Sequence, residues 1–502
     1  MESALQDYLW EVSPSRNETC YVDNGNDISR PCGQGRIPVY SAAVTSVDQA
    51  QKAVRFANRR NLSLVIRNTG HSVGGQSSGP DSFQIFTQAF KDITFTDDFV
   101  PDGGSLSEGQ AVTVGAGVLV GELCDAAAMR RQVVVTGQYL SVGVAGGLVQ
   151  GGGLSPALSP LKGLIADLAL QFEVVTADGR YVVANQYKNT DLFWALRGGG
   201  GGTFGLVMST TMRTFLDIPS VVSQISFNTS DLDERYWSAV REVAHTTREL
   251  TTNNYTDSSA VWFISRAANG TPSMALTAYF MNKTEVVVAD NLFAELLVTL
   301  RAKRLAVQYN STPYPWLSSF LAMQVASSGS PRRTDAYETN VIVPEELYHS
   351  PDRLDRFLDR VRQLPFNPLN RIDVDFLGGQ VSANGELVDT ALHPAWRSAS
   401  IQLRHIMYVG QGIQEQQAAL NRLRNVIWPL LRSIKPSPRA SYLNLADPTL
   451  EDWQGWFWGD KYPRLLKIKK KWDPDDLFIV RQGVGSEMWD EEGLCRRSVR
   501  KS

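Results

Sequence analysis

The spacing of apolar residues along the chain changes once, near Phe215. Before it, short apolar runs of strand length alternate with runs of helical spacing, and glycine-rich loops join them. After it the strand-like runs are 221–227, 260–265, 274–280, RIDVDFLGGQV and SIQLRHIMYV, and the helical runs are 231–250, 286–300 and 414–432. We therefore predict an N-terminal part (1–215), a central part of sheet plus helices (216–434) and a C-terminal segment (435–502).

Between Val39 and His71 the pattern predicts a strand, a helix, a second strand and a loop, in that order. Ser46 can cap the helix, whose apolar residues recur at helical spacing over 47–57. The loop leaves the end of the second strand. Open α/β sheets commonly place their ligand-binding loops at such ends.

Three glycine-rich stretches distinguish this part: RNTGHSVGGQSSGP (67–80), VVVTGQYLSVGVAGGLVQGGGLSP (133–156) and GGGGGTFG (198–205). Glycines let the backbone approach a flat or anionic group closely, and backbone N–H groups can bind a pyrophosphate without a basic side chain. The third stretch follows a helix and precedes a strand, which reverses the order of a Rossmann fingerprint, and no P-loop motif occurs.

Composition and charge narrow the class of protein. The chain has 502 residues, of which 43% are hydrophobic and 20% charged, as expected for two globular domains. The net charge of −3 indicates neither nucleic acid nor an anionic membrane as a partner, and no apolar run reaches the roughly 18 residues of a membrane span. Neither C-x-x-C nor histidine pairs at metal-ligand spacing occur, which disfavours a zinc site, and no G-x-S-x-G lies at a predicted strand-to-helix turn, which disfavours a serine-hydrolase site. The basic run Lys467–Trp472 predicts a solvated helix face.

Glycosylation sequons indicate the secretory pathway. They lie at Asn17, Asn61, Asn228, Asn254, Asn269, Asn282 and Asn310. In an oxidising compartment Cys20 and Cys32 can form a short disulfide; otherwise they are two free thiols. The start of the chain has no signal-peptide pattern, so either a signal is missing from this sequence or the protein is intracellular. We predict a secreted or secretory-pathway glycoprotein.

Four motifs in a fixed order carry a family resemblance. They are RNTGHSVGGQSSG, VGVAGGLVQGGG, DLFWALRGGGGGTFGLV and WGDKYPRLLKIKKKWDPDDLFIVRQGVGSE. Over residues 39–487 the chain resembles the vanillyl-alcohol-oxidase superfamily of flavoproteins, in its berberine-bridge-enzyme-like branch, and there the fungal isoamyl-alcohol-oxidase-like oxidoreductases. The resemblance implies an α+β fold. A two-part FAD-binding domain of the PCMH type is formed by the N- and C-terminal segments, and a central substrate domain has an antiparallel sheet covered by helices.

The resemblance gives His71 a role. From the residues alone, His71 is either a general base or a satisfied polar residue. In the family the histidine of this loop is bonded to the C8 methyl of FAD, so His71 is the expected covalent tether. The other FAD contacts implied are Arg67, Asn68, Thr69, Gly70, Ser72, Val73, Gly74, Gln76, Ser77, Tyr139, Ser141, Val142, Gly143, Gly146, Gly147, Gly152, Gly205, Val207, Tyr442, Asn444 and Lys461.

Two positions depart from the family pattern. Many relatives carry a second tether, a cysteine, where this chain has Tyr139, so a single tether is expected. Relatives often place an asparagine near the flavin pyrimidine where this chain has Lys461. Lys461 either stabilises the anionic reduced flavin or points to solvent.

The catalytic base is the least defined part of the site. Sugar-oxidising relatives use a tyrosine in the segment that reads YLNLAD here, giving Tyr442, Asn444 and Asp447. Alkaloid-oxidising relatives use a glutamate where this chain has Arg404. Strand alternation places Gln402 and Arg404 on one face and His405 on the other. The catalytic candidates are therefore Tyr442, Arg404 and Gln402, each of which is either a pocket residue or an ordinary core or surface residue.

The implied function is that of an FAD-dependent oxidase. A hydride passes from an organic substrate, an alcohol or a secondary-metabolite intermediate, to covalent FAD, and O2 reoxidises the flavin to give H2O2. Val142 supports this, since relatives with valine at its position tend to react with oxygen. Two alternatives stay open: a biosynthetic oxidative cyclase, and a non-catalytic flavin-binding or allergen-like protein. The expected partners are a small-molecule substrate and O2, with no nucleic acid and no membrane; the oligomeric state is left open.

Overall fold

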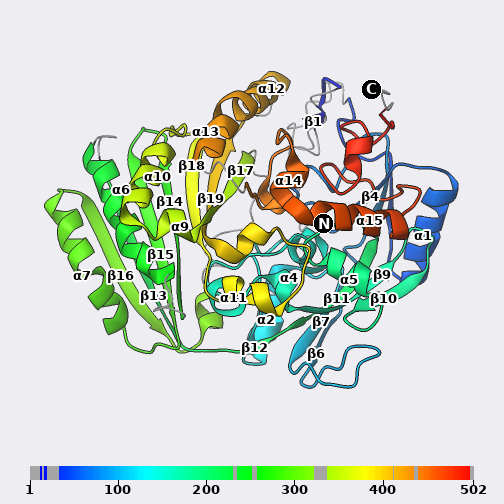
Figure 1. Cartoon of the computed structure of the whole chain (residues 1–502), viewed down its shortest axis with the longest axis horizontal. Coiled ribbons are helices and arrows are strands. Elements are labelled where there is room, and N and C mark those ends of the chain that lie inside the picture. Colours follow the sequence, from blue (N-terminus) through cyan, green and yellow to red (C-terminus); the bar gives the residue numbers. More distant parts are fainter. Residues whose placement is uncertain are drawn as a thin grey trace, which may run out of the picture.

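The computed structural model describes residues 12–13, 16–19, 33–229, 234–251, 257–321, 336–410, 412–434 and 439–497. Cys20, Cys32 and Asn254 lie outside these ranges, so the predicted disulfide and that sequon are not described. Figure 1 shows two halves. In one, the first elements of the chain lie together with the last; in the other, a large sheet is flanked by helices.

A three-stranded parallel sheet with the order β3-β5-β4 begins the first half. Its elements are β3 (Tyr40–Ala43), α1 (Val47–Arg59), β4 (Leu64–Arg67) and β5 (Phe83–Phe86). Ser46 caps α1 by accepting a hydrogen bond from the backbone N–H of Gln49 at 3.3 Å. Ala50, Val54 and Ala57 are buried on one face of the helix. The predicted order of strand, helix, strand and loop is confirmed.

A five-stranded sheet has the order β10-β9-β11-β7-β6, and the third glycine stretch leads into its strand β11. All its neighbouring strands are antiparallel. Its strands are β6 (Ile93–Thr96), β7 (Ala111–Gly115), β9 (Ala169–Val175), β10 (Tyr181–Asn185) and β11 (Leu206–Arg213). The other elements are β1 (Val12–Ser13), β2 (Glu18–Thr19), α2 (Val120–Met129), β8 (Gln132–Val133), a π-helical turn (Val144–Leu148), α3 (Ser159–Lys162), α4 (Ile165–Leu168), α5 (Thr190–Leu196) and β12 (Phe215–Leu216).

The central part forms a seven-stranded antiparallel sheet with the order β16-β13-β15-β14-β18-β19-β17. Its strands are β13 (Ser220–Asn228), β14 (Ser258–Arg266), β15 (Pro272–Met281), β16 (Ala306–Tyr314), β17 (Ala336–Pro344), β18 (Asn370–Phe376) and β19 (Ala399–Tyr408). Its helices are α6 (Glu234–Thr247), α7 (Val287–Ala302), α9 (Glu345–Tyr348), α10 (Pro351–Val361), α11 (Gln380–Leu387), α12 (Ile413–Arg422) and α13 (Trp428–Ile434). In Figure 1, α6, α7 and α10 lie on the side of the sheet away from the first half. The predicted strands and helices of this part are confirmed.

The last described residues return to the first half, where Figure 1 shows the orange and red helices beside the cyan elements. The helices there are α14 (Trp453–Phe457) and α15 (Tyr462–Trp472), and α15 packs on α5. The indole Nε1 of Trp458 donates to the carbonyl of Gly198 at 2.9 Å, on the third glycine stretch. The two-part domain implied by the resemblance is therefore present, while the boundaries at 215 and 434 stay a prediction.

The prediction that Lys467–Trp472 forms a solvated helix face is right for Lys467, Lys470 and Lys471, which are exposed, and wrong for Lys469. Lys469, in the basic run taken for a solvated face, is fully buried. Its ammonium donates to the carbonyls of Thr203 at 2.8 Å and Phe478 at 2.6 Å and pairs with Asp473. The lysine therefore ties the helix to the glycine loop that precedes β11.

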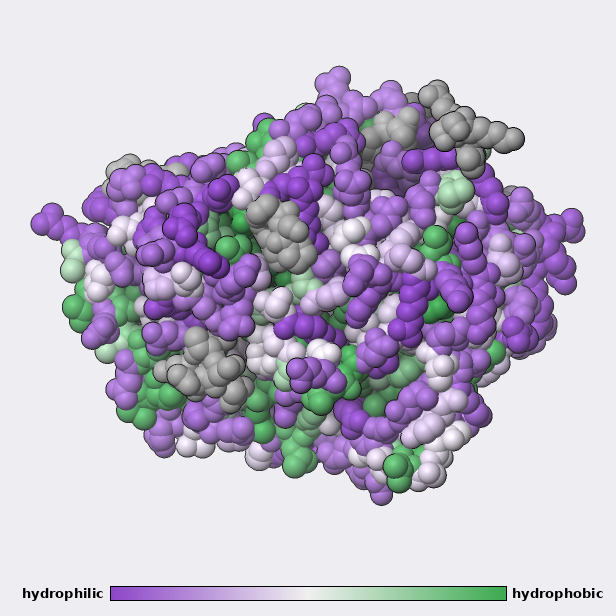
Figure 2. Space-filling view, viewed as in Figure 1, coloured by the Kyte–Doolittle hydropathy of each residue, from purple (hydrophilic) through white to green (hydrophobic). Residues whose placement is uncertain are grey.

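The visible face of the molecule is mostly hydrophilic, with apolar residues in small separate patches (Figure 2). None of the helices in the described ranges has the length and apolar character needed to cross a membrane.

Candidate functional site

A cavity of about 270 Å³ lies between the glycine loops and the seven-stranded sheet. Its lining includes these sequence-predicted residues: Asn68, Thr69, Gly70, His71, Ser72, Val73, Gln76, Ser77, Tyr139, Val142, Gly143, Gly146, Gly147, Gly205, Val207, Gln402, Arg404, Tyr442 and Asn444. Arg67, Gly74, Ser141, Gly152 and Lys461 are not part of the lining. Residues from all three segments of the chain thus meet around one space.

His71 stands on the loop that leaves β4. Gly70 and Gly75 have φ values of 84° and 69°, in the left-handed region where glycine is the least strained residue. The imidazole Nε2 lies 2.9 Å from the hydroxyl oxygen of Ser141, and the ring stacks on Tyr139 with centroids 6.2 Å apart. Surrounding protein lowers the pKa of His71 to about 4 although the side chain opens on the cavity. The imidazole is therefore neutral at physiological pH and keeps a nucleophilic nitrogen.

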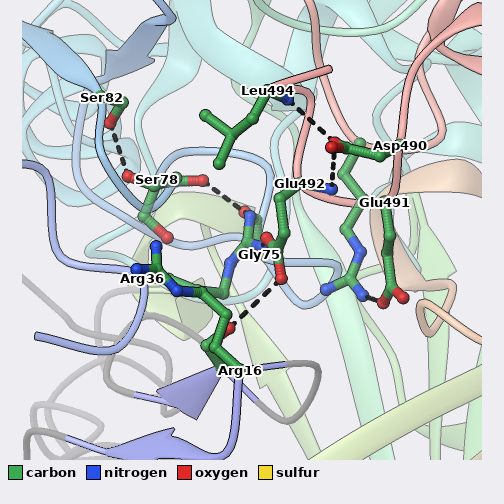
Figure 3. Close-up of polar contacts among 12 residues, drawn as sticks. Arg16, Arg36, Gly75, Ser78, Ser82, Asp490, Glu491, Glu492 and Leu494 are labelled. Carbon is green, nitrogen blue, oxygen red and sulfur yellow. Dashed lines mark hydrogen bonds and ion pairs between the residues drawn. The ribbon is translucent and has the colours of Figure 1, made fainter. Parts of the chain in front are cut away.

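The His71 loop is held from behind by Arg36, which the sequence did not single out. The guanidinium Nη2 donates to the carbonyls of Gly75 at 3.1 Å and Ser78 at 2.9 Å, and Nη1 pairs with Glu492 near the end of the chain (Figure 3). Burial, and then the nearby charge of Arg481, lower the pKa of Arg36. The C-terminal segment thus fixes the backbone of the loop.

We expect Glu492→Gln to destabilise the protein by about 1–3 kcal/mol, because a buried charge-assisted contact is lost. Glu491→Gln is the matched control. Glu491 pairs with Arg481 and its side chain is 56% exposed against 10% for Glu492, so its loss should cost about 0–1 kcal/mol. Denaturant unfolding of both variants measures the difference, and equal stabilities would contradict the assigned role of Glu492.

The first and second glycine stretches approach each other so closely that a side chain would not fit. A Cβ on Gly143 would lie 2.5 Å from the side-chain amide of Asn68. Both amide atoms of Asn68 are buried without a hydrogen-bond partner within the described residues, although Asn68 lines the cavity. Buried polar groups are normally satisfied. An orphaned amide beside glycine backbone therefore fits a polar ligand such as FAD.

Tyr442 enters the cavity from the C-terminal segment. Its phenolic oxygen accepts hydrogen bonds from the backbone N–H of Gly153 at 3.2 Å and from Nδ2 of Asn444 at 2.8 Å. Asn340 on β17 holds the backbone of Tyr442, since its Oδ1 accepts from the Tyr442 N–H at 2.6 Å. Burial raises the pKa of Tyr442 to about 12, and the two donors oppose that shift. Asp447, the last polar residue of the YLNLAD segment, is not part of the lining; it accepts from Nε1 of Trp428 at 2.9 Å.

Arg404 lines the cavity, and its guanidinium is paired with three carboxylates. Its guanidinium lies 2.8 Å from Asp375 Oδ2, 3.0 Å from Asp373 Oδ2 and 3.6 Å from Glu338 Oε2. Burial lowers the pKa of Arg404, but these three charges outweigh it and raise the pKa. A guanidinium held as a cation has no lone pair to accept a proton. Arg404 can therefore act through its positive charge but not as a catalytic base.

Glu338 and Asp375 are cavity residues that sequence reasoning missed. Asp375 pairs with Gln402 across β18 and β19, and Asp373 with Arg404. Directly opposed residues share a face of the sheet. One signal was available: Asp373 and Asp375 alternate with apolar residues inside RIDVDFL, where a buried strand rarely carries acids.

Two further candidates are not brought to the cavity lining. Lys461 donates from Nζ to the carbonyl of Thr390 at 2.6 Å. His405 lies on the opposite face of β19, as alternation predicted, with Nε2 3.2 Å from the carbonyl of Pro365. Burial lowers the pKa of His405 to about 4. The geometry gives no support to a flavin contact by Lys461 or to a pocket role for His405.

Comparisons with known proteins identify the family of the chain. Residues 38–185 match the family model described as FAD binding domain, and residues 441–485 match that described as Berberine and berberine like. The chain is 47% identical over 500 residues to the FAD-linked oxidoreductase notD' of Aspergillus versicolor, covering 99% of this chain and 80% of that protein.

Solved structures share the fold. A VAO-type flavoprotein of Myceliophthora thermophila is 29% identical, with a TM-score of 0.81 over 93% of this chain and 84% of that one. Berberine bridge enzyme of Eschscholzia californica is 18% identical, with a TM-score of 0.71 over 88% of this chain and 89% of that one. At that identity the likeness concerns the fold alone.

Proposed function

Because the chain belongs to the vanillyl-alcohol-oxidase family of FAD-linked oxidoreductases, in its berberine-bridge-enzyme-like branch, we propose that it is an oxidase acting on a small organic molecule, with FAD tethered through His71 alone. FAD supplies the acceptor for a hydride from the substrate, and O2 then regenerates the oxidised flavin and yields H2O2. The observation that carries this proposal is the imidazole of His71, oriented by Ser141 and Tyr139 at the edge of a cavity that glycine backbone lines.

Different residues of the cavity have different proposed roles. Asn68 and the first two glycine stretches hold the cofactor, and the contact between Arg36 and the His71 loop keeps that loop rigid. No cysteine is among the described residues that line the cavity, and Tyr139 occupies the position of the second tether. A single covalent link follows. Tyr442 is the proposed base: donors from Gly153 and Asn444 stabilise its phenolate, the form that takes a proton from the substrate.

An anaerobic screen tests the oxidase proposal. Candidate alcohols, amines and phenols are mixed with the yellow protein, and loss of flavin absorbance identifies a reducing substrate. Admission of air should restore the colour with one H2O2 per turnover. A flavin that no compound bleaches, or one that air does not reoxidise, would argue against an oxidase.

We further propose that the protein passes through the secretory pathway. The asparagines of all six sequons in the described ranges are exposed: Asn17, Asn61, Asn228, Asn269, Asn282 and Asn310. Exposure is what N-glycosylation requires.

Protein from a eukaryotic host should therefore gain gel mobility after endoglycosidase treatment, by an amount that reflects several glycans. Replacement of the six asparagines by glutamine should abolish the shift. An unchanged mobility of the wild-type protein would contradict the secretory proposal.

A further inference from the structure

The wall of the cavity formed by β17, β18 and β19 carries more acid than base. It consists of Glu338, Asp373 and Asp375 with the guanidiniums of Arg371 and Arg404, and we call it the acidic wall. Three carboxylates face two cations. On this wall Glu338, Asp375 and Arg404 line the cavity directly, and His71 on the opposite loop is neutral and offers no compensating charge.

The two guanidinium groups are unevenly distributed among the three carboxylates. Asp373 accepts from Arg371 Nε at 2.6 Å and Nη2 at 3.0 Å and also pairs with Arg404. Asp375 lies 2.8 Å from Arg404 Nε. Glu338 is left with the longest contact, 3.6 Å, and its Oε2 has no hydrogen-bond partner within the described residues. Burial raises the pKa of both Glu338 and Asp375, and the charge of Arg404 opposes that shift.

A second, independent feature lies beside these acids. Gln402 is 0% exposed and lines the cavity, and neither its amide oxygen nor its amide nitrogen has a hydrogen-bond partner in the part of the chain that the structure describes. Gln402 is directly opposite Asp375 in the register of β19 and β18. A buried amide oxygen and a carboxylate oxygen are thus both left as acceptors on one wall of the cavity. Because buried polar groups are normally hydrogen-bonded, these acceptors are free to bind a donor on a ligand.

We propose that the acidic wall binds a cationic nitrogen of the substrate, a protonated amine, with Glu338 as its main counter-ion and Gln402 as an acceptor of its hydrogen bonds. This inference rests on the proposed oxidase and names the class of molecule that its cavity selects. A neutral substrate leaves the excess carboxylate uncompensated in a buried site, and a carboxylate substrate adds a like charge; both are costly.

The test measures binding to the oxidised holoenzyme without turnover. The probes are 2-phenylethylamine, its uncharged counterpart 2-phenylethanol and the anion phenylacetate, titrated anaerobically at pH 7 and followed by the shift of the flavin absorbance. The amine should bind about 10-fold or more tighter than the alcohol, which corresponds to about 1.4 kcal/mol. Phenylacetate should bind weakest.

Variants assign that preference to the acidic wall. Glu338→Gln should reduce the preference for the amine at least about 10-fold, while Glu338→Asp should retain most of it. Asp375→Asn frees part of the charge of Arg404 and should improve the binding of phenylacetate. Glu346→Gln is the control, because Glu346 is an exposed acid in α9, just beyond β17.

Equal binding of amine and alcohol by the wild-type protein overturns the proposal, as does an undiminished amine preference in Glu338→Gln. If Glu338→Gln loses its flavin, the three-probe comparison on the wild-type protein decides alone. A wild-type preparation without flavin would instead refute the proposed function. A flavin-loaded preparation without the amine preference refutes only this inference.

Discussion

His71→Ala is expected to turn a flavin that survives denaturation into one that acid releases completely. In the wild-type protein the neutral imidazole carries the proposed bond to FAD, so acid precipitation should leave a yellow pellet. A single link without sulfur should also leave the flavin fluorescent on a denaturing gel. In His71→Ala the glycine loops and Asn68 still line the cavity, so FAD should bind, but without a covalent bond.

The matched control is His245→Ala on α6, where the imidazole contacts Asp355 outside the cavity lining. Its flavin should stay attached. Substrate oxidation by His71→Ala should be slower, because the tether fixes the ring. Release of FAD from the wild-type protein would refute the tether, and retention in His71→Ala would mean that another residue is the anchor.

Tyr442→Phe should lower the rate of anaerobic flavin reduction by about 10²–10⁴-fold, the usual cost of losing a general base. The substrate is whichever compound bleaches the flavin in the anaerobic screen. The flavin should stay bound, since Phe keeps the ring that packs on Trp396. Tyr462→Phe is the control: it removes a half-buried phenol of the same segment, one that donates to Glu487 outside the cavity lining.

If Tyr442 is the base, the rate of flavin reduction should depend on pH. The pKa of Tyr442 is raised to about 12, so its basic form is scarce at neutral pH and increases as pH rises. Flavin reduction by the wild-type protein should therefore accelerate from pH 6 to pH 9, while Tyr442→Phe should show no such increase. A wild-type rate independent of pH, or an unchanged rate in Tyr442→Phe, would remove Tyr442 from the mechanism and turn attention to Glu338.

The local sequence pattern was sufficient to predict the helix and strand that position the His71 loop. Ser46, the spacing of Ala50 and Val54, and the strand before Arg67 are short-range features, and they predict the helix and the exit of the His71 loop. The motif resemblance likewise located most of the cavity lining, because the expected FAD contacts are clustered in the sequence. The resemblance was misleading at Lys461. This residue occupies the matching motif position, but its side chain is not part of the cavity lining.

What the sequence by itself determined, then, was the run of elements, the glycine loops and the family of the flavin site. Only the tertiary structure decided the partners of the charges. Arg36 and Glu492 are 456 residues apart in the sequence, and Lys469 and Thr203 are 266 apart. Glu338 and Asp375 both contact Arg404 only because β19 lies between β17 and β18. Whether a charged side chain is solvated or buried depends on contacts between distant segments. The hydrophobic spacing along one strand or helix does not encode these contacts. The acidic wall therefore forms only when β17, β18 and β19 lie side by side.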